Sequence, residues 1–383
     1  MNPGPKKLMK IPFQDLKTTN APRMEQLVRS AEAVLRSGRY INGPRLEEFE
    51  GRMEHLFQAD FCIGVSTGLD ALRLILTACK TLGRLHDGDE VIVPANTFIA
   101  TFLAVTGCGL TAVAADVVEA TFCLDYDRLP VTPRTKAVIP VHLYGRVCLD
   151  AASARRLKEK GLIIIEDCAQ AIGARAENPV LNRSVMAGGL ADAAAISFYP
   201  AKNIGAFGDA GAVLTDDPEL AAAVRRLANY GSDEKYIHKL CGFNCRLDEL
   251  QAALLLVKLD DTISESVRRR ERARLYNSLI SDGELTLPAI PDYEESHVWH
   301  QYVVRHPQRD LLRRYLADNG IGTEIHYPVP CHLQPCYRNH PQLKIYEQPV
   351  VAERLAGEIL SLPIANVSDE DIRFIADTIN KRL

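Results

Sequence analysis

The chain has 383 residues, of which 47% are apolar and 25% charged, and its 45 basic and 49 acidic side chains give a net charge of −4. This is the composition of a globular protein long enough for two or three domain-sized units. No long block of like charge and no apolar run of about 18 residues occurs, which argues against a nucleic-acid footprint and a membrane span. Since no apolar leader follows the N-terminal lysines, we expect a cytoplasmic protein.

Two further features of composition are expected to be structural only. The arginine-rich run at residues 268–274 is interleaved with acid in a helical pattern, so we interpret it as a solvated helix face. The ten cysteines are scattered through apolar segments without a Cys-x-x-Cys pair, so no metal site is expected.

From about residue 60 to 215, short β-branched runs alternate with helical patterns. Uninterrupted apolar strands are typical of a mostly parallel sheet covered on both faces, so the pattern predicts a three-layer αβα domain with ligands at the carboxyl ends of its strands. The predicted strands are 60–65, 90–94, 111–116, 136–142, 162–167 and 193–198, and the helices between them include 70–78 and 151–160.

After residue 215 the pattern becomes helical, with one helix from about residue 217 and a much longer one from about 246. A smaller α+β unit follows, with a strand over 297–305, a helix over 309–317 and a closing helix over 368–383. We therefore predict a large domain with an N-terminal arm over 1–250, and a bridging helix with a small domain over 251–383.

Lys202 lies where a reactive lysine is expected. An apolar strand ends near Tyr199, Lys202 follows, and Gly205, Gly208 and Gly211 then keep the backbone unobstructed. Removal of its amine from water would lower the pKa and favour Schiff-base chemistry. Glycine-rich turns also occur for packing reasons alone.

Two other strand ends carry candidate groups. Ser66 to Leu72 joins a strand to a helix through small residues, with Asp70 expected to cap the helix, and such a start binds phosphate or is simply capped. Asp167 ends the most apolar strand, with Gln170 just beyond. A carboxylate there fits a cationic pyridinium nitrogen, a metal or a loop cap.

An amine, a carboxylate and a phosphate cradle at one sheet edge are what pyridoxal phosphate requires. With these motifs the chain resembles the fold type I, pyridoxal-phosphate-dependent aminotransferases of the DegT/DnrJ sugar-aminotransferase group over nearly its whole length. The matching motifs are YING (40–43), STGLDAL (66–72), PANTFIAT (94–101), PVHLYG (140–145), EDCAQA (166–171), SFYPAKNIGAFGD (197–209), GFNCRLDELQAA (242–253) and HYP (326–328).

The resemblance implies roles around the cofactor. Lys202 would form the Schiff base and then move a proton between Cα of the amino donor and C4′ of the cofactor. Asp167 would pair with the pyridine nitrogen, Gln170 would contact the ring hydroxyl, and Phe98 would stack on the ring. The phosphate would be held by the backbone at Gly68 and Leu69, by the Ser197 hydroxyl, and by Asn244 of a second subunit in a homodimer.

The resemblance also implies a substrate, a nucleotide-linked keto-sugar, with L-glutamate as donor. Residues 229–236 and 322–335 look most like members that aminate C3 of a dTDP-linked 3-keto-6-deoxyhexose. His326 and Tyr327 would then face the sugar or its diphosphate, and the less favoured alternative for His326 is a loop hydrogen bond. Arg246 and His332 are weaker candidates. We interpret His142 and Tyr144 as strand-end packing residues.

Other functions stay open on the sequence. Amination at C4 or of a UDP- or GDP-linked sugar is the alternative within the class. A non-catalytic, cofactor-binding regulatory protein and a pyridoxal-phosphate lyase are alternatives from other classes. Lys202, Asp167 and Ser197 together favour the enzyme, because a regulator needs no reactive lysine.

Overall fold

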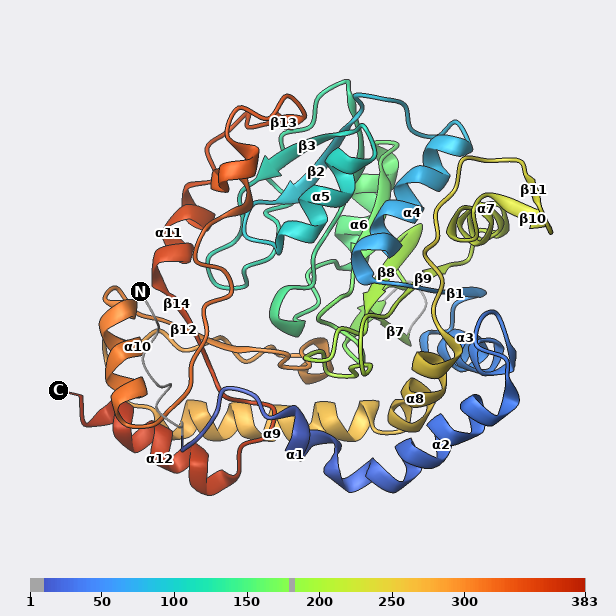
Figure 1. The fold of residues 1–383 in the computed structure, drawn as a ribbon. Coiled ribbons are helices and arrows are strands. Elements are labelled where there is room, and N and C mark those ends of the chain that lie inside the picture. The colour runs from blue at the N-terminus through green and yellow to red at the C-terminus, as the bar shows by residue number, and fades with distance from the viewer. Residues whose placement is uncertain (1–9, 179–182, 383) are drawn as a thin grey trace, which may run out of the picture.

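The predicted apolar runs form one central sheet in the structure, a computed structural model that describes residues 10–178 and 183–382 (Figure 1). Its strand order is β1-β9-β8-β5-β4-β2-β3-β13. Within the described part of this sheet, β9 alone runs in the direction opposite to the other strands, which confirms the mostly parallel α/β sheet. The strands are β1 (Phe61–Val65), β2 (Glu90–Pro94), β3 (Thr111–Ala115), β4 (Thr135–Val138), β5 (Ile163–Asp167), β8 (Ala193–Ser197), β9 (Gly211–Thr215) and β13 (Leu343–Lys344).

Alternate residues of these strands pack into different helical layers, as the strand period of two requires. Val91 and Val93 of β2 join the core under α4, α5 and α7, whereas Ile92 joins the core under α6. A further core on that second side packs α3 and α8 against the sheet. These helices are α3 (Pro44–Phe57), α4 (Gly68–Thr81), α5 (Ile99–Gly107), α6 (Ala151–Glu159), α7 (Pro218–Ala228) and α8 (Glu249–Leu259).

Strand β4 is shorter than predicted, because it ends at Val138 rather than at residue 142. Pro140 has no N–H group to continue a ladder, and the backbone at His142 turns into a short 3-10 segment over Leu143–Gly145. Beyond Val138 the chain keeps single contacts to β5 without forming a regular strand, since the Pro140 carbonyl accepts from the Asp167 N–H and the His142 N–H donates to the Asp167 carbonyl.

The single long helix predicted from about residue 246 is wrong, because the structure has two helices, α8 and α9 (Thr262–Leu279). Asp260 and Asp261 separate them, and their carboxylates form ion pairs with Arg52 and Arg23 instead of continuing a helical surface. Aspartate is a poor helix-interior residue because its side chain competes for backbone hydrogen bonds, which explains a break at this pair.

The smaller α+β unit has a hydrophobic core of its own. Its strand over 297–305 shortens to β12, since Trp299 has a positive φ of 49° that no strand accommodates. Ile11 of the N-terminal arm packs in the same core and bridges to Ile321. The division at residue 250 stays a prediction. The elements are α10 (Arg309–Asp318), α12 (Asp369–Asn380), β12 (Tyr302–Arg305) and β14 (Ile359–Leu362), whereas α11 (Val350–Glu358) packs into the core under α4, α5 and α7.

The remaining helices and strands lie on the periphery. Helices α1 and α2 run along the outside of α8 and α9, with α1 in front of α9 in Figure 1. Among the described residues, no helix has both the length and the apolar character needed to cross a membrane. The peripheral elements are α1 (Leu16–Asn20), α2 (Met24–Ser37), β6 (Arg175–Asn178), β7 (Arg183–Met186), β10 (Ser232–Glu234) and β11 (Ile237–His238).

The expected solvated face at residues 268–274 is only partly present. The Arg268 and Arg274 side chains are 45% and 48% exposed, but that of Arg269 is only 5% exposed. Successive helical residues point about 100° apart, so a run of arginines cannot all face water. Arg269 and Arg272, three residues apart, point instead toward the loops that α9 supports.

Gly211 allows a close backbone approach beside the predicted site. It pairs with both Val65 and Ser197, and a Cβ atom there would lie 2.4 Å from the carbonyl of Thr67. We predict that Gly211→Ala lowers the free energy of unfolding by about 2 kcal/mol or more, since backbone must move to relieve the overlap. Urea unfolding tests this.

Gly51→Ala in α3 is the matched control, because nothing lies within 4 Å of a Cβ there. It should leave stability unchanged or raise it by up to about 1 kcal/mol, as alanine is the better helix former. Equal stabilities for the two variants would contradict the close approach.

Candidate functional site

Asp167 is the last residue of β5, and its carboxylate is buried at the carboxyl end of the sheet. Thr101 Oγ1 donates to its Oδ2 at 3.0 Å, and the Ala169 N–H donates to its Oδ1 at 3.1 Å. Burial raises the pKa of Asp167, while these hydrogen bonds and the charge of Lys202 oppose the rise. The site therefore holds a carboxylate that a second cation would stabilise.

Lys202 follows β8, the strand that pairs directly with β5 in the sheet. Its backbone N–H donates to the Tyr199 carbonyl at 2.8 Å, which folds the chain into a turn after the strand. Burial lowers the pKa of the Lys202 ammonium to about 8, although the Asp167 carboxylate acts in the opposite direction. About a tenth of this amine is thus unprotonated at pH 7, several hundred times more than in a free lysine, and the unprotonated form is the one that nucleophilic chemistry requires.

Gly68 and Ser197 lie against each other beside this turn. A Cβ atom on Gly68 would lie 2.6 Å from that of Ser197, so only glycine fits. Gly68 and Leu69 are the first residues of α4, where N–H groups lack intrahelical acceptors and attract anions. The prediction that Asp70 caps this helix is wrong. The cap is Thr67, whose Oγ1 accepts from the Asp70 N–H at 2.8 Å, because the helix begins before Asp70.

Gln170 links the end of β5 to two aromatic residues. Its Oε1 accepts from the Tyr144 N–H at 2.6 Å, and its Nε2 donates to the Tyr327 hydroxyl at 3.2 Å. The Tyr327 ring lies 5.3 Å from that of Phe98, which is 51% exposed at the start of α5. Gln170, Phe98 and Tyr327, predicted separately from distant motifs, are therefore neighbours.

His326 packs next to this group. Its Nδ1 is 2.8 Å from the Ser361 hydroxyl, and burial lowers the pKa of its ring to about 4, with Lys202 adding to the shift. The ring is therefore neutral at physiological pH. The Tyr144 hydroxyl donates to the His326 carbonyl, so Tyr144 braces the site beyond the packing role expected for it.

Three candidates have their contacts elsewhere. Arg246 Nη1 donates to Asn229 Oδ1 at 3.0 Å in a different cavity from the one that Lys202 lines. His332 is buried against Glu353, with 2.9 Å between Nε2 and Oε1. Asn244 is exposed on the surface. Within this chain, these residues are not gathered around Lys202.

His142 forms a buried hydrogen bond with Glu166 that sequence reasoning missed. Its Nε2 lies 2.6 Å from Glu166 Oε2, and its Nδ1 accepts from the Cys148 N–H at 3.0 Å. Glu166 also accepts from the N–H groups of Gly188 and Leu190. The carboxylate is thereby satisfied, and both imidazole nitrogens are engaged, so the pair supports the end of β5 instead of forming a metal centre with the adjacent Cys168.

Thr101 and Asn203 are further site residues that received no role from the sequence. Thr101 lies within a matching motif, but its bond to Asp167 spans 66 residues. Asn203 follows Lys202 directly, and its Oδ1 lies 2.9 Å from His300 Nδ1. Only the position of Asn203 beside Lys202 signalled a role, since its partner comes from the smaller unit.

Known proteins resemble this chain in sequence. Residues 23–380 match the model of the DegT/DnrJ/EryC1/StrS aminotransferase family. The chain is 44% identical to the erythromycin biosynthesis sensory transduction protein EryC1 of Saccharopolyspora erythraea, over 93% of this chain and 94% of that protein. It is 43% identical to the dTDP-3-amino-3,4,6-trideoxy-alpha-D-glucose transaminase of Streptomyces venezuelae, over 93% and 91%.

The crystal structure of NtdA from Bacillus subtilis with bound cofactor PMP has the same fold. It superposes with a TM-score of 0.86 and 30% identity, over 98% of this chain and 86% of that one. The residues present here fit such a cofactor, pyridoxal phosphate or its amine form. Lys202 offers the amine, Asp167 a buried carboxylate for the ring nitrogen, and the bare backbone at Gly68 an anion cradle beside Ser197.

Burial lowers the pKa of Lys202 and the Asp167 carboxylate raises it, so the reactivity of this amine should depend on pH in a predictable way. In the cofactor-free protein, reductive methylation of Lys202 should reach half its maximal rate near pH 8, where the amine loses its proton. In Asp167→Asn the midpoint should move to lower pH, because no carboxylate then stabilises the ammonium. Peptide mass spectrometry measures both profiles.

Asp209→Asn is the control, since it removes an exposed carboxylate from the same glycine-rich segment. Its profile should match the wild type. An unchanged or upward-shifted midpoint in Asp167→Asn would contradict the coupling of the two groups.

Proposed function

The chain belongs to the DegT/DnrJ/EryC1/StrS aminotransferase family, and we propose that it transfers the amino group of L-glutamate to C3 of a dTDP-linked 3-keto-6-deoxyhexose. The protein is an aminotransferase, and pyridoxal phosphate is its cofactor. The observation that carries the proposal is the desolvated Lys202 amine at the same sheet edge as the Asp167 carboxylate. The choice of sugar rests on the transaminase of S. venezuelae.

The chemistry divides between the cofactor and the chain. When bound, pyridoxal phosphate supplies an electron sink that allows the Cα–H bond of the donor to break. Lys202 takes that proton as the base and returns a proton as the acid, so its pKa near 8 suits both tasks. In the second half-reaction the same amine provides the proton for the carbon that receives the nitrogen. The donor leaves as a keto acid and the keto-sugar as an amino-sugar.

The other site residues are proposed to bind and orient. Asp167 would hold the ring nitrogen protonated, Gln170 would contact the ring hydroxyl, and Phe98 would cover the ring. Gly68, Leu69 and Ser197 would bind the phosphate. His326 and Tyr327 would face the sugar, since Tyr327 lies beside Phe98, His326 packs against Tyr327 and is near the charge of Lys202, and the neutral His326 ring can donate or accept.

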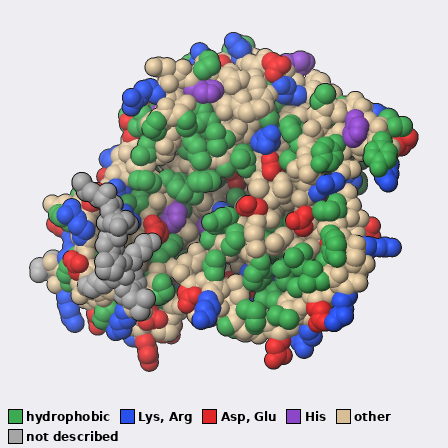
Figure 2. Space-filling view, in the orientation of Figure 1, with side chains coloured by type: hydrophobic (Ala, Val, Ile, Leu, Met, Phe, Trp, Pro, Cys, Tyr) green, Lys and Arg blue, Asp and Glu red, His purple; other side chains and the backbone are tan. Residues whose placement is uncertain are grey.

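A homodimer completes this proposal. Met24, Val28 and Leu35 lie on one face of α2 and are 47%, 57% and 61% exposed. Figure 2 shows hydrophobic side chains gathered on the lower right of this face, where α2 and α8 lie in Figure 1. An apolar patch of this kind is typical of a subunit interface. Asn244 would reach the cofactor phosphate of the second subunit.

The reaction is tested with a panel of dTDP-, UDP- and GDP-linked keto-sugars and L-glutamate, read by mass spectrometry of the product. We expect amination of the dTDP-linked 3-keto-6-deoxyhexose, and loss of turnover by about 10³-fold or more in Lys202→Ala, which removes the proton-transfer group. If only a C4-keto sugar or a UDP- or GDP-linked sugar is aminated, that sugar replaces the dTDP-linked 3-keto-6-deoxyhexose as the proposed substrate. Because EryC1 is named a sensory transduction protein, cofactor binding without amination of any sugar would favour a regulator.

The shared site is tested by mixing Asn244→Ala and Lys202→Ala subunits. Each homodimer should be impaired, whereas a heterodimer would contain one site with both residues intact. Random mixing should restore about a quarter of wild-type activity, since half of the dimers are hybrids with one good site. Activity no greater than the mean of the two homodimers would show that Asn244 acts within its own chain.

A further inference from the structure

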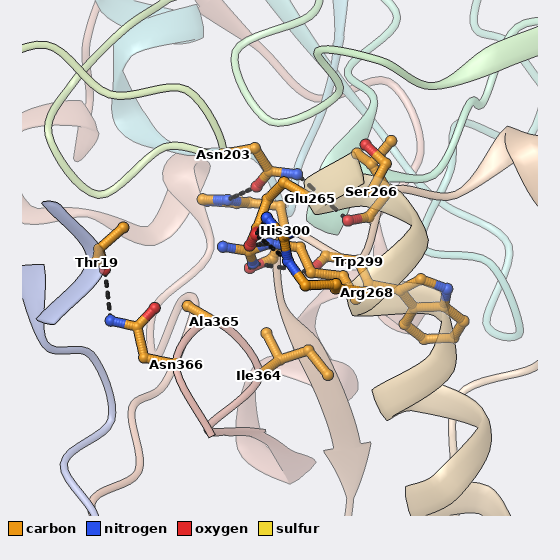
Figure 3. Close-up of polar contacts among 12 residues, drawn as sticks. Thr19, Asn203, Glu265, Ser266, Arg268, Trp299, His300, Ile364, Ala365 and Asn366 are labelled. Carbon is orange, nitrogen blue, oxygen red and sulfur yellow. Dashed lines mark hydrogen bonds and ion pairs between the residues drawn. The ribbon is translucent and has the colours of Figure 1, made fainter. Parts of the chain in front are cut away.

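A cavity of about 450 Å³ is lined in part by Lys202. It lies between Arg23, helix α9 and the loop at Ala365 and Asn366, and Figure 3 shows this region, with Asn203 and His300 above α9. Metabolite-binding cavities commonly have volumes of about 300–1,000 Å³, so this space can hold more than a bare ion.

The walls of this cavity carry far more positive than negative charge. Its described lining contains only two carboxylates, those of Asp261 and Glu265. Asp261 pairs with Arg23, and Glu265 is shared by two guanidinium groups. The cationic residues that line it, apart from Lys202, are Arg23, Lys258, Arg268, Arg269 and Arg272.

Two of these cations are buried. Arg269 is 4% exposed, with its Nε 2.8 Å from Glu265 Oε1 and its Nη1 donating to the carbonyls of Trp299 and His300. Lys258 is 8% exposed, and its Nζ donates to the Gly205 carbonyl. Burial and the nearby Arg23 charge lower the pKa of Lys258 to about 8. Arg269 shares the Glu265 carboxylate with Arg268, whereas the carbonyl that accepts from Lys258 carries no charge to balance the ammonium.

Arg268 and Arg272 extend the positive wall toward the opening. Arg268 donates to Glu265 Oε2 from Nε and Nη2 at 3.2 and 2.9 Å, and its side chain stays 45% exposed. Arg272 donates to the Ile364 carbonyl at 3.1 Å. Burial and the charge of Arg268 lower the pKa of Arg272. The nearby Glu265 carboxylate partly opposes this lowering. These cations repel one another across the cavity wall.

We propose that this cavity is an anion-binding site that holds the distal anionic group of a substrate while its reacting carbon lies at Lys202. The proposal rests on the proposed function. An entering carboxylate or phosphate balances the cationic wall, and guanidinium groups bind both in charge-assisted hydrogen bonds. Two substrates carry such an anionic group. One is a dicarboxylic amino donor, through its side-chain carboxylate, and the other is a nucleotide-linked sugar, through its phosphates.

Binding of unreactive probes tests the site itself. Glutarate and inorganic pyrophosphate are titrated into the holoenzyme by calorimetry. We expect at least one of them to bind, and Arg268→Gln to weaken it about tenfold by removing a wall charge. Arg268→Lys should bind within about threefold of the wild type, because the charge remains. Arg274→Gln is the matched control, since Arg274 lies on the same helix at similar exposure but pairs with Glu294.

A variant with the opposite expected effect guards against a folding defect. Asp261→Asn removes a carboxylate from the cavity and frees Arg23, so probe binding should become severalfold tighter. Binding in every variant should weaken as salt is raised. Equal affinities for the wild type, Arg268→Gln and Asp261→Asn, or no binding of either probe, would overturn the site.

The two half-reactions identify the source of the anion. Single-turnover measurements follow the absorbance of the cofactor with L-glutamate alone, and then with keto-sugar alone. A higher apparent dissociation constant in Arg268→Gln for glutamate assigns the cavity to the donor carboxylate, and one for the keto-sugar assigns it to the phosphates. If the apparent dissociation constants of both half-reactions are unchanged in Arg268→Gln, the cavity does not bind a substrate. If no sugar is aminated but the probes still bind, only the proposed function is overturned.

Discussion

The structure depends on one opposition of charges, that of the Lys202 ammonium and the Asp167 carboxylate at a poorly hydrated edge of the sheet. Burial disfavours the charged form of both groups, and each stabilises the charged form of the other. Their positions follow from strand order, because β5 and β8 are neighbours and run in parallel, so their carboxyl ends meet at one edge. The fold thereby places an amine and an acid together, although 35 residues separate them in sequence.

Both groups need support that the sheet alone does not provide. On the acid side, Thr101 bonds to Asp167, and the buried pair of His142 and Glu166 fixes the end of β5. On the amine side, Asn203 bonds to His300 of the smaller unit, whose carbonyl accepts from Arg269. Burial and the charge of Lys202 hold the pKa of His300 well below its usual range, so its ring is neutral and adds no repulsion to the amine.

The sequence predicted the parts of the site that depend on local pattern. Continuous apolar runs identified the strands, and parallel order alone placed Lys202, Asp167 and Gly68 at one edge. It did not predict contacts between distant segments, such as those of Gln170 with Tyr327 and of His326 with Ser361. Neither partner in such a pair has a local signature, because ordinary loop residues form these contacts once the two units pack.

Two other predictions were wrong, wholly or in part, because the local sequence pattern is compatible with more than one structure. The arginine run has the charge pattern of a surface helix, and only the 3.6-residue period with the loops above α9 decides which arginines turn inward. The predicted long helix has a helical pattern on both sides of Asp260 and Asp261, so the pattern alone does not reveal the break. Ion pairs with Arg23 and Arg52, more than 200 residues away, stabilise it.

The exposure of aromatic residues around Lys202 bears on how water is excluded. Phe98, whose ring lies 5.3 Å from that of Tyr327, is 51% exposed, and Tyr199, whose carbonyl accepts from the Lys202 N–H, is 55% exposed. Proton transfer by an amine with a lowered pKa depends on a water-poor environment, since full hydration would return the pKa toward that of a free lysine. A single chain supplies the buried floor of the site but leaves this aromatic rim open. A second copy that covers the rim would serve catalysis directly, beyond adding a phosphate contact from Asn244.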